Sequence, residues 1–165
     1  MERILDAKSK RNKKVCIYQM ADDSSFYETE EFIKQQKAIV ALINNTTGWQ
    51  YERMYLDVDG NHNEFRKMIE DCRVGKIDVI VTKTILRFAG TLKDTLKVAK
   101  ELVEMKPAIE IVFVDEAVYS TDEEKMSVIM ELIKDGESAA GNVFGDCSAE
   151  EYFSTQYKKY IQAGR

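Results

Sequence analysis

The sequence contains little cysteine, histidine and proline. Among its 165 residues there are three cysteines, one histidine and one proline. The cysteines Cys16, Cys72 and Cys147 form no C-x-x-C pair, and His62 is the single histidine, so neither a zinc site nor a disulfide framework is expected. Buried free thiols are the simpler interpretation. We therefore expect no metal and no cofactor.

Long hydrophobic runs are also missing. No segment approaches the roughly 20 consecutive apolar residues that a membrane-spanning helix requires. The start of the chain, MERILDAKSKRNKK, is charged and lacks the apolar centre of a secretory signal peptide. The sequence therefore predicts a protein without membrane contacts and with a cytoplasmic location.

The composition is that of an ordinary globular domain, with 44% hydrophobic and 32% charged residues, which excludes collagen-like and fully disordered chains. The 24 basic and 29 acidic side chains give a net charge of −5, which argues against a surface that is basic throughout. Basic residues concentrate in segment 8–14 (KSKRNKK), which ends in Lys13 and Lys14. Such a segment either binds DNA phosphates or is a solvated arm.

Short β-rich runs alternate with helix-length amphipathic segments along most of the chain. The β-rich runs cover residues 15–18, 51–56, 77–82 and 109–114. A capping box at Ser25 and Glu28 predicts the start of the first helix. Strands joined by helices form parallel sheets with right-handed crossovers. We therefore predict an α/β fold with a mostly parallel, four- to five-stranded sheet flanked by helices and followed by a C-terminal helical segment.

The predicted organisation has four parts. They are a basic leader (1–14), an α/β domain (15–134), a glycine-containing joint (135–147) and a C-terminal helix (148–165). Aromatic side chains share one face of the last helix, which favours core packing or a subunit contact over base stacking. These side chains are Phe153, Tyr157 and Tyr160.

Polar side chains follow the β-rich runs, where ligands of open parallel sheets gather. Carboxylates dominate, and two pairs of them come after the first two runs. These pairs are Asp22 with Asp23 and Asp57 with Asp59. Because Mg²⁺ prefers carboxylate oxygens and water, one hypothesis is a Mg²⁺-dependent phosphotransfer site built from these four aspartates. The alternative is a solvated loop rim.

One long stretch carries a more specific pattern. Residues 65–96 (FRKMIEDCRVGKIDVIVTKTILRFAGTLKDTL) follow F-x-x-M-x-x-D-x-x-x-G-K-I-D-x-V-V-x-K-x-I-S-R-F-x-R-N-x-x-D-T-L almost position for position. Shorter matches precede this stretch, at Tyr18 (Y-x-R-V-S-T), at Ile33 and Gln36 (S-I-x-x-Q), at Gly48-Trp49 (G-W) and at Tyr55-Leu56-Asp57 (Y-x-D). In these motifs the chain resembles the catalytic domain of serine site-specific recombinases, the resolvase and invertase family. Segment 149–162 is similar to the family's dimerising helix.

The resemblance implies a function in DNA recombination. In that family a serine hydroxyl attacks a DNA phosphodiester and stays joined to the 5′ phosphate, while several arginines stabilise the developing charge. Family members work on DNA as dimers and tetramers. The implied partners are therefore DNA and either further copies of this chain or an active recombinase relative.

The motif positions that carry this chemistry are altered in the sequence. In the gapless register the nucleophilic serine is Asp22, and the arginine two residues before it is Met20. His62 lies near the place of another arginine, and the R-F-x-R pair retains Arg87 but has Gly90 in second place. An acid at the nucleophile position repels the phosphodiester. We therefore expect a cleavage-deficient recombinase domain that serves as an assembly, regulatory or DNA-associated module.

Three further expectations concern individual residues. An active enzyme would need a displaced nucleophile, for which Ser24 and Ser25 are the candidates. A buried salt bridge between Asp22 and Arg87 would turn the former active site into a structural pair. The side chains expected to contact DNA phosphates are Arg87, Lys83, Lys13 and Lys14.

Overall fold

A five-stranded sheet forms the centre of the protein. The structure is a computed structural model and describes residues 12–142 and 149–163. The strands are β1 (Lys13–Ala21), β2 (Trp49–Val58), β3 (Val79–Thr82), β4 (Glu110–Phe113) and β5 (Val118–Tyr119). They lie in the order β2-β1-β3-β4-β5, with only β5 antiparallel to its neighbour. The predicted α/β fold with a mostly parallel sheet is confirmed.

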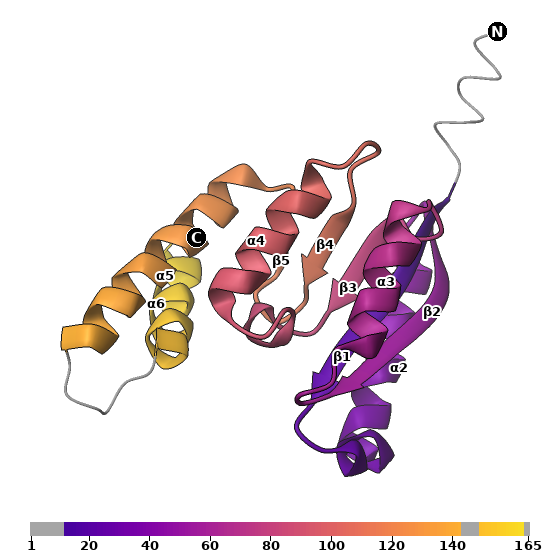
Figure 1. Cartoon of the computed structure of the whole chain (residues 1–165), viewed down its shortest axis with the longest axis horizontal. Helices are drawn as coiled ribbons and strands as arrows, with labels where there is room; N and C mark the ends of the chain where they lie inside the picture. The colour runs from indigo at the N-terminus through magenta and orange to yellow at the C-terminus, as the bar shows by residue number, and fades with distance from the viewer. Residues whose placement is uncertain (1–11, 143–148, 164–165) are drawn as a thin grey trace, which may run out of the picture.

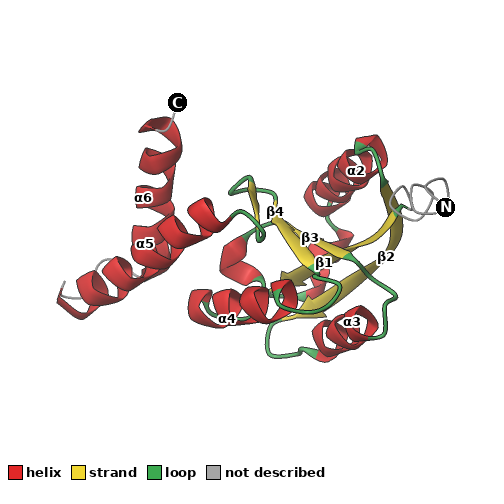
Figure 2. Ribbon diagram, turned by 90° about the horizontal axis from the view of Figure 1, so that it is seen from above, coloured by secondary structure: helices red, strands yellow, loops and turns green. Residues whose placement is uncertain are grey.

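Helices cover both faces of this sheet (Figures 1 and 2). The α-helices are α2 (Glu30–Asn45), α3 (Asn63–Arg73), α4 (Leu92–Val103), α5 (Glu123–Asn142) and α6 (Ala149–Ala163). Two short 3-10 helices, η1 (Ser24–Glu28) and η2 (Ile85–Arg87), follow β1 and β3. Helix α2 packs on one face, and α3 and α4 pack on the other.

Side-chain alternation along β1 explains the two layers of core. Successive residues of a strand point to opposite faces of the sheet. Val15 and Ile17 join the cluster under α2, whereas Cys16 and Tyr18 join the larger cluster under α3 and α4. The larger cluster also contains Phe153 and Tyr157, so part of the aromatic face of α6 is core, as the sequence predicts.

The start of α2 differs from the predicted capping box. Ser25 lies within η1, where its backbone N–H donates to the Asp23 carboxylate at 2.8 Å. Thr29 caps α2 instead, because its Oγ1 accepts the backbone N–H of Phe32 at 3.1 Å. Asp23 therefore stabilises a separate short turn, which delays the helix by several residues.

The boundaries of the predicted parts also shift. Helix α5 continues to Asn142, past Gly136 and Gly141, so the expected joint is helical from 135 to 142 and the rest of it lies outside the described residues. An interior glycine costs only about 1 kcal/mol in a helix, which neighbouring turns can tolerate. Lys13 and Lys14 belong to β1 and not to a leader, whose first 11 residues lie outside the described ranges. Within residues 12–142 and 149–163, none of the helices has the length and apolar character that a bilayer crossing requires.

Candidate functional site

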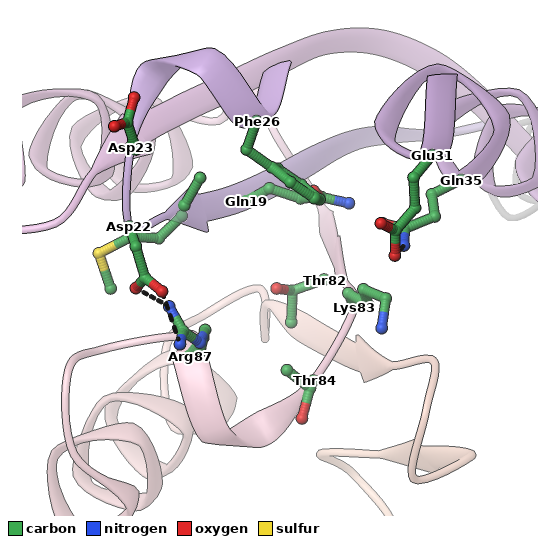
Figure 3. Close-up of a pocket in the computed structure, with 12 residues that line it drawn as sticks. Gln19, Asp22, Asp23, Phe26, Glu31, Gln35, Thr82, Lys83, Thr84 and Arg87 are labelled. Carbon is green, nitrogen blue, oxygen red and sulfur yellow. Dashed lines mark hydrogen bonds and ion pairs between the residues drawn. The ribbon is translucent and has the colours of Figure 1, made fainter. Parts of the chain in front are cut away.

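A pocket of about 380 Å³ opens at the carboxyl ends of β1 and β3. The chain leaves β1 for β2 on one side and returns to β3 on the other side of β1. This change of direction separates the loops that follow the two strands, and ligands of open α/β sheets bind at such a position. The lining residues are Gln19, Met20, Ala21, Asp22, Asp23, Phe26, Glu31, Gln35, Thr82, Lys83, Thr84 and Arg87 (Figure 3).

Asp22 and Arg87 meet at one side of this pocket (Figure 3). Arg87 Nη1 donates to Asp22 Oδ1, and Nη2 donates to Oδ2 at 3.3 Å. The hydrogen bonds to Arg87 and its positive charge lower the pKa of Asp22 below its usual range. The side chains are 70% (Asp22) and 51% (Arg87) exposed, so the pair differs from a buried structural salt bridge. Because exposed ion pairs are weak, a phosphate ligand can compete with Asp22 for the guanidinium.

A buried acid holds the loop that carries Arg87. Glu116, which is only 8% exposed, accepts the Thr84 hydroxyl at 2.9 Å and the Ile85 backbone N–H at 2.7 Å. The Tyr157 hydroxyl of α6 donates to the backbone oxygen of Glu116 at 2.9 Å. Burial raises the pKa of Glu116 despite these hydrogen bonds. The C-terminal helix is thus connected through Glu116 to the position of Arg87.

The raised pKa of Glu116 predicts a pH-dependent stability. The folded protein holds this proton more tightly than the unfolded chain, whose glutamate has the usual pKa of 4.5. The free energy of unfolding contributed by Glu116 is therefore fully present below pH 4.5 and is lost as the pH rises through the folded pKa. Urea denaturation should show a smaller loss of stability between pH 4.5 and pH 7 in Glu116→Gln than in the wild type. The exposed Glu101→Gln variant serves as control, and identical slopes for all three proteins would contradict the prediction.

The four aspartates of the hypothetical Mg²⁺ site do not converge. Asp57 is 3% exposed and accepts three hydrogen bonds, from the Tyr18 hydroxyl at 2.9 Å and from the backbone N–H groups of Glu64 and Phe65 at 3.0 and 2.9 Å. It is a cap of α3, whereas Asp59 is exposed in the following turn. Among the described residues, no group of three or more His, Cys, Asp or Glu is arranged to hold a metal ion. The four-aspartate hypothesis is therefore wrong.

The candidate serines lie outside the pocket lining. Ser24 and Ser25 open η1 and are exposed, one and two residues beyond the last aspartate that lines the pocket. Met20 does line the pocket and also packs against the main core. A thioether in this position supplies no positive charge for a phosphate.

The other two altered positions lie away from this pocket. His62 precedes α3 and lines a different depression, together with residues of α3 and α4. Gly90 has a backbone φ of +100°, a conformation that favours glycine and would strain an arginine. Neither residue lines the pocket of Asp22 and Arg87.

The lysines expected at DNA are divided between the two ends of the sheet. Lys83 lines the pocket and forms an ion pair with Asp115 at 2.9 Å. Lys13 and Lys14 begin β1, roughly 26 Å from the pocket end of that strand at about 3.3 Å per residue. The Lys14 side chain donates to the backbone oxygen of Gly75, so it also has a structural contact. A small ligand in the pocket therefore cannot reach all four predicted cations.

Sequence reasoning missed several polar residues of the pocket, and three of them lie on the side formed by β1 and α2. Gln19 is a 6% exposed side chain of β1, and Glu31 and Gln35 extend from α2. A glutamine beside a β-rich apolar run is a signal that could have identified Gln19. Glu31 and Gln35 are four residues apart on one helix face, but only the tertiary fold places that face against the end of β1.

Comparison with protein families agrees with the motif pattern. The model of the resolvase N-terminal domain matches residues 24–140, which is well over half of the chain. The chain belongs to this resolvase family. The match begins two residues after Asp22, so the equivalence of Asp22 to the family's nucleophilic serine stays a prediction. Among proteins with curated functions, none matches the sequence significantly.

Solved structures share the fold of this resolvase-family chain. The N-terminal catalytic domain of TP901-1 integrase has 20% sequence identity and a TM-score of 0.56, covering 76% of this chain and 99% of the integrase domain. A resolvase-family site-specific recombinase from Streptococcus pneumoniae has 16% identity and a TM-score of 0.63, covering 93% and 100% of the two chains. These similarities support the resolvase-type catalytic fold with its mixed five-stranded sheet.

Proposed function

We propose that this chain is a resolvase-family module of DNA site-specific recombination that binds DNA phosphates without cleaving the strand. Membership of the resolvase family supports the link to recombination. The observation that carries the cleavage-deficient part is the pairing of Asp22 with Arg87 in the candidate pocket. The Asp22 carboxylate accepts hydrogen bonds from Nη1 and Nη2 of Arg87, and a bound phosphate would compete with it for these donors.

The electrostatics of the pocket favour binding over chemistry. An attacking group must approach phosphorus within roughly 3.5 Å, and an ionised carboxylate is repelled by the negative phosphodiester. Arg87 holds the pKa of Asp22 low, so this acid stays charged at neutral pH. The altered positions Met20 and Gly90 provide no guanidinium to offset the repulsion. The exposed Asp22–Arg87 pair can still exchange for a backbone phosphate.

The proposed partners are DNA and a second recombinase subunit, either another copy of this chain or an active relative. Support for self-association comes from the family, whose members assemble on DNA. In this chain α6 packs onto the domain through Phe153 and Tyr157, which are 1% and 4% exposed. The C-terminal segment therefore contributes to the fold of the catalytic-type domain as well as to any assembly.

Strand cleavage is tested by incubating the full chain with supercoiled DNA and separating the products on denaturing gels. We expect no protein covalently joined to DNA, because neither candidate serine lines the pocket and the Asp22 carboxylate repels the phosphodiester. An active serine recombinase with its own site provides the positive control. A covalent adduct that disappears in Ser24→Ala or Ser25→Ala would overturn the proposal and establish a displaced nucleophile.

Assembly is tested separately by sedimentation. We expect the chain to sediment as an oligomer alone or as a mixed complex with an active family member on DNA. The proposed module function would lose its basis if the chain stayed monomeric at all concentrations and bound neither DNA nor active relatives.

A further inference from the structure

The candidate pocket has a second end, away from the Asp22–Arg87 pair. Figure 3 shows Asp22 and Arg87 on one side of the view and Glu31 and Gln35 on the other, with Phe26 and the Gln19 side chain between them. We name the part lined by Gln19, Phe26, Glu31 and Gln35 the amide end. Its residues come from β1, η1 and α2.

Two buried polar atoms at the amide end have no hydrogen-bond partner in the described part of the chain. They are the donor Nε2 of Gln19 and the acceptor Oε1 of Gln35. Gln19 is 6% exposed, so bulk water does not readily satisfy its amide. Buried polar groups are nearly always paired in folded proteins, and unpaired ones need an explanation. A ligand that carries both an acceptor and a donor would pair these two atoms.

The rest of the amide end narrows the chemistry of that ligand. The Glu31 carboxylate accepts the Gln35 Nε2–H at 3.3 Å and keeps further acceptor capacity beside Gln35 Oε1. Phe26 adds a half-buried aromatic ring, which edge contacts with Phe32 and Tyr27 hold at centroid distances of 5.7 and 6.1 Å. The site thus offers one donor, neighbouring acceptors that include an anion, and a flat apolar surface.

We propose that the amide end binds a guanine base. The carbonyl O6 of guanine accepts from Gln19 Nε2, and the adjacent N1–H and N2–H groups donate to the Glu31 carboxylate and Gln35 Oε1. The Phe26 ring provides a stacking surface, as aromatic side chains do for unpaired bases. The pocket volume of about 380 Å³ lies in the range of small-molecule sites and exceeds one planar base.

Guanine is favoured over the other bases because it presents one acceptor followed by two donors. Thymine offers O4 and N3–H but then the acceptor O2, which would face Gln35 Oε1, and cytosine begins with a donor. Adenine carries an amino group in place of O6, so its donor would face the Gln19 donor, and it has no N1–H for the carboxylate. A site built to hydrogen-bond one pattern discriminates strongly against an analogue that leaves its buried groups unpaired. The 5′ phosphate on the sugar of a guanine nucleotide would be attracted by Lys83 and Arg87, which line the same pocket.

The test is titration calorimetry of the full chain with the four deoxynucleoside monophosphates. We expect dGMP to bind at least tenfold more tightly than dAMP, dCMP or dTMP. Glu31→Gln should weaken dGMP binding about tenfold, because a charged acceptor is replaced by a neutral amide. Glu30→Gln is the matched control, because this neighbouring exposed acid does not line the pocket, and it should leave dGMP affinity unchanged.

A second variant separates binding from folding. Gln19→Leu removes the unpaired donor from a buried site, so its melting temperature should equal or exceed that of the wild type while dGMP affinity falls about tenfold. No saturable heat with millimolar dGMP, equal affinity for all four nucleotides, or equal effects of Glu31→Gln and Glu30→Gln would each overturn the proposal. An internal water that satisfies both amides would give the first of these results.

Single-stranded oligonucleotides distinguish the source of the base. Oligonucleotides with one unpaired guanine or one unpaired adenine in an otherwise identical sequence are compared with free dGMP. Preference for the guanine strand indicates a base of DNA, whereas preference for dGMP alone indicates a free nucleotide, and both outcomes support a guanine site. Guanine binding does not require the proposed lack of strand cleavage, so a covalent DNA adduct would overturn that function and leave this inference standing.

Discussion

Replacing Asp57 with alanine is expected to lower the free energy of unfolding by about 3 kcal/mol. The substitution removes the acceptor of the Tyr18 hydroxyl, and Tyr18 is 0% exposed, so water cannot replace that acceptor. It also removes the cap from α3, because the backbone N–H groups of Glu64 and Phe65 both donate to this carboxylate. Urea denaturation followed by circular dichroism measures the loss.

Asp59→Ala is the matched control for Asp57→Ala. Asp59 is exposed two residues later, so its replacement should change stability by less than about 0.5 kcal/mol. Asp57→Asn keeps one acceptor oxygen, so its loss of stability should lie between those of Asp57→Ala and Asp59→Ala. Addition of Mg²⁺ should leave the melting temperature of the wild type unchanged, because the Asp57 oxygens already accept hydrogen bonds. Equal effects of the Asp57 and Asp59 substitutions would show that Asp57 is not a structural cap.

The layout of the fold could be predicted because it is encoded in local patterns. The apolar run 15–18 predicts a buried strand, and the face formed by Phe32, Ile39 and Ile43 predicts the helix that covers it. Strand β5 is only two residues long and carries no comparable pattern. The predicted start of α2 at Ser25 is too early, because Thr29 caps the helix and Ser25 lies within η1. Only the backbone after η1 favours Thr29.

The roles of individual site residues could be predicted less well, because they depend on contacts between distant segments. Position alone made Asp57 a metal-ligand candidate, whereas its burial under Tyr18 makes it a helix cap. Glu116 follows a predicted strand, but its contact with Thr84 joins residues 32 apart in the sequence. Asp22 and Arg87 are 65 residues apart, and only the sheet order brings them into one pocket.

Replacing Asp22 with asparagine is expected to strengthen DNA binding about tenfold at low salt. The carboxylate repels phosphate and accepts hydrogen bonds from two nitrogens of Arg87. Asparagine has nearly the same shape but no charge, so the guanidinium can exchange its partner for a phosphate more easily. Fluorescence anisotropy of labelled duplex DNA measures the gain in affinity at about 50 mM and about 300 mM salt, below and above physiological ionic strength. The gain should be smaller at the higher salt concentration.

Asp23→Asn is the control that distinguishes the effect of the Asp22–Arg87 pair on DNA affinity from the effect of net charge. It changes the net charge by the same amount, but the Asp23 carboxylate accepts the Ser25 backbone N–H at 2.8 Å and caps η1. Its effect on DNA affinity should therefore be less than about threefold, in keeping with a screened long-range charge. Equal gains for the two variants would assign the effect to net charge alone. A loss of affinity in Asp22→Asn would mean that the acid itself contacts DNA, and the electrostatic argument for a non-cleaving phosphate pocket would fail.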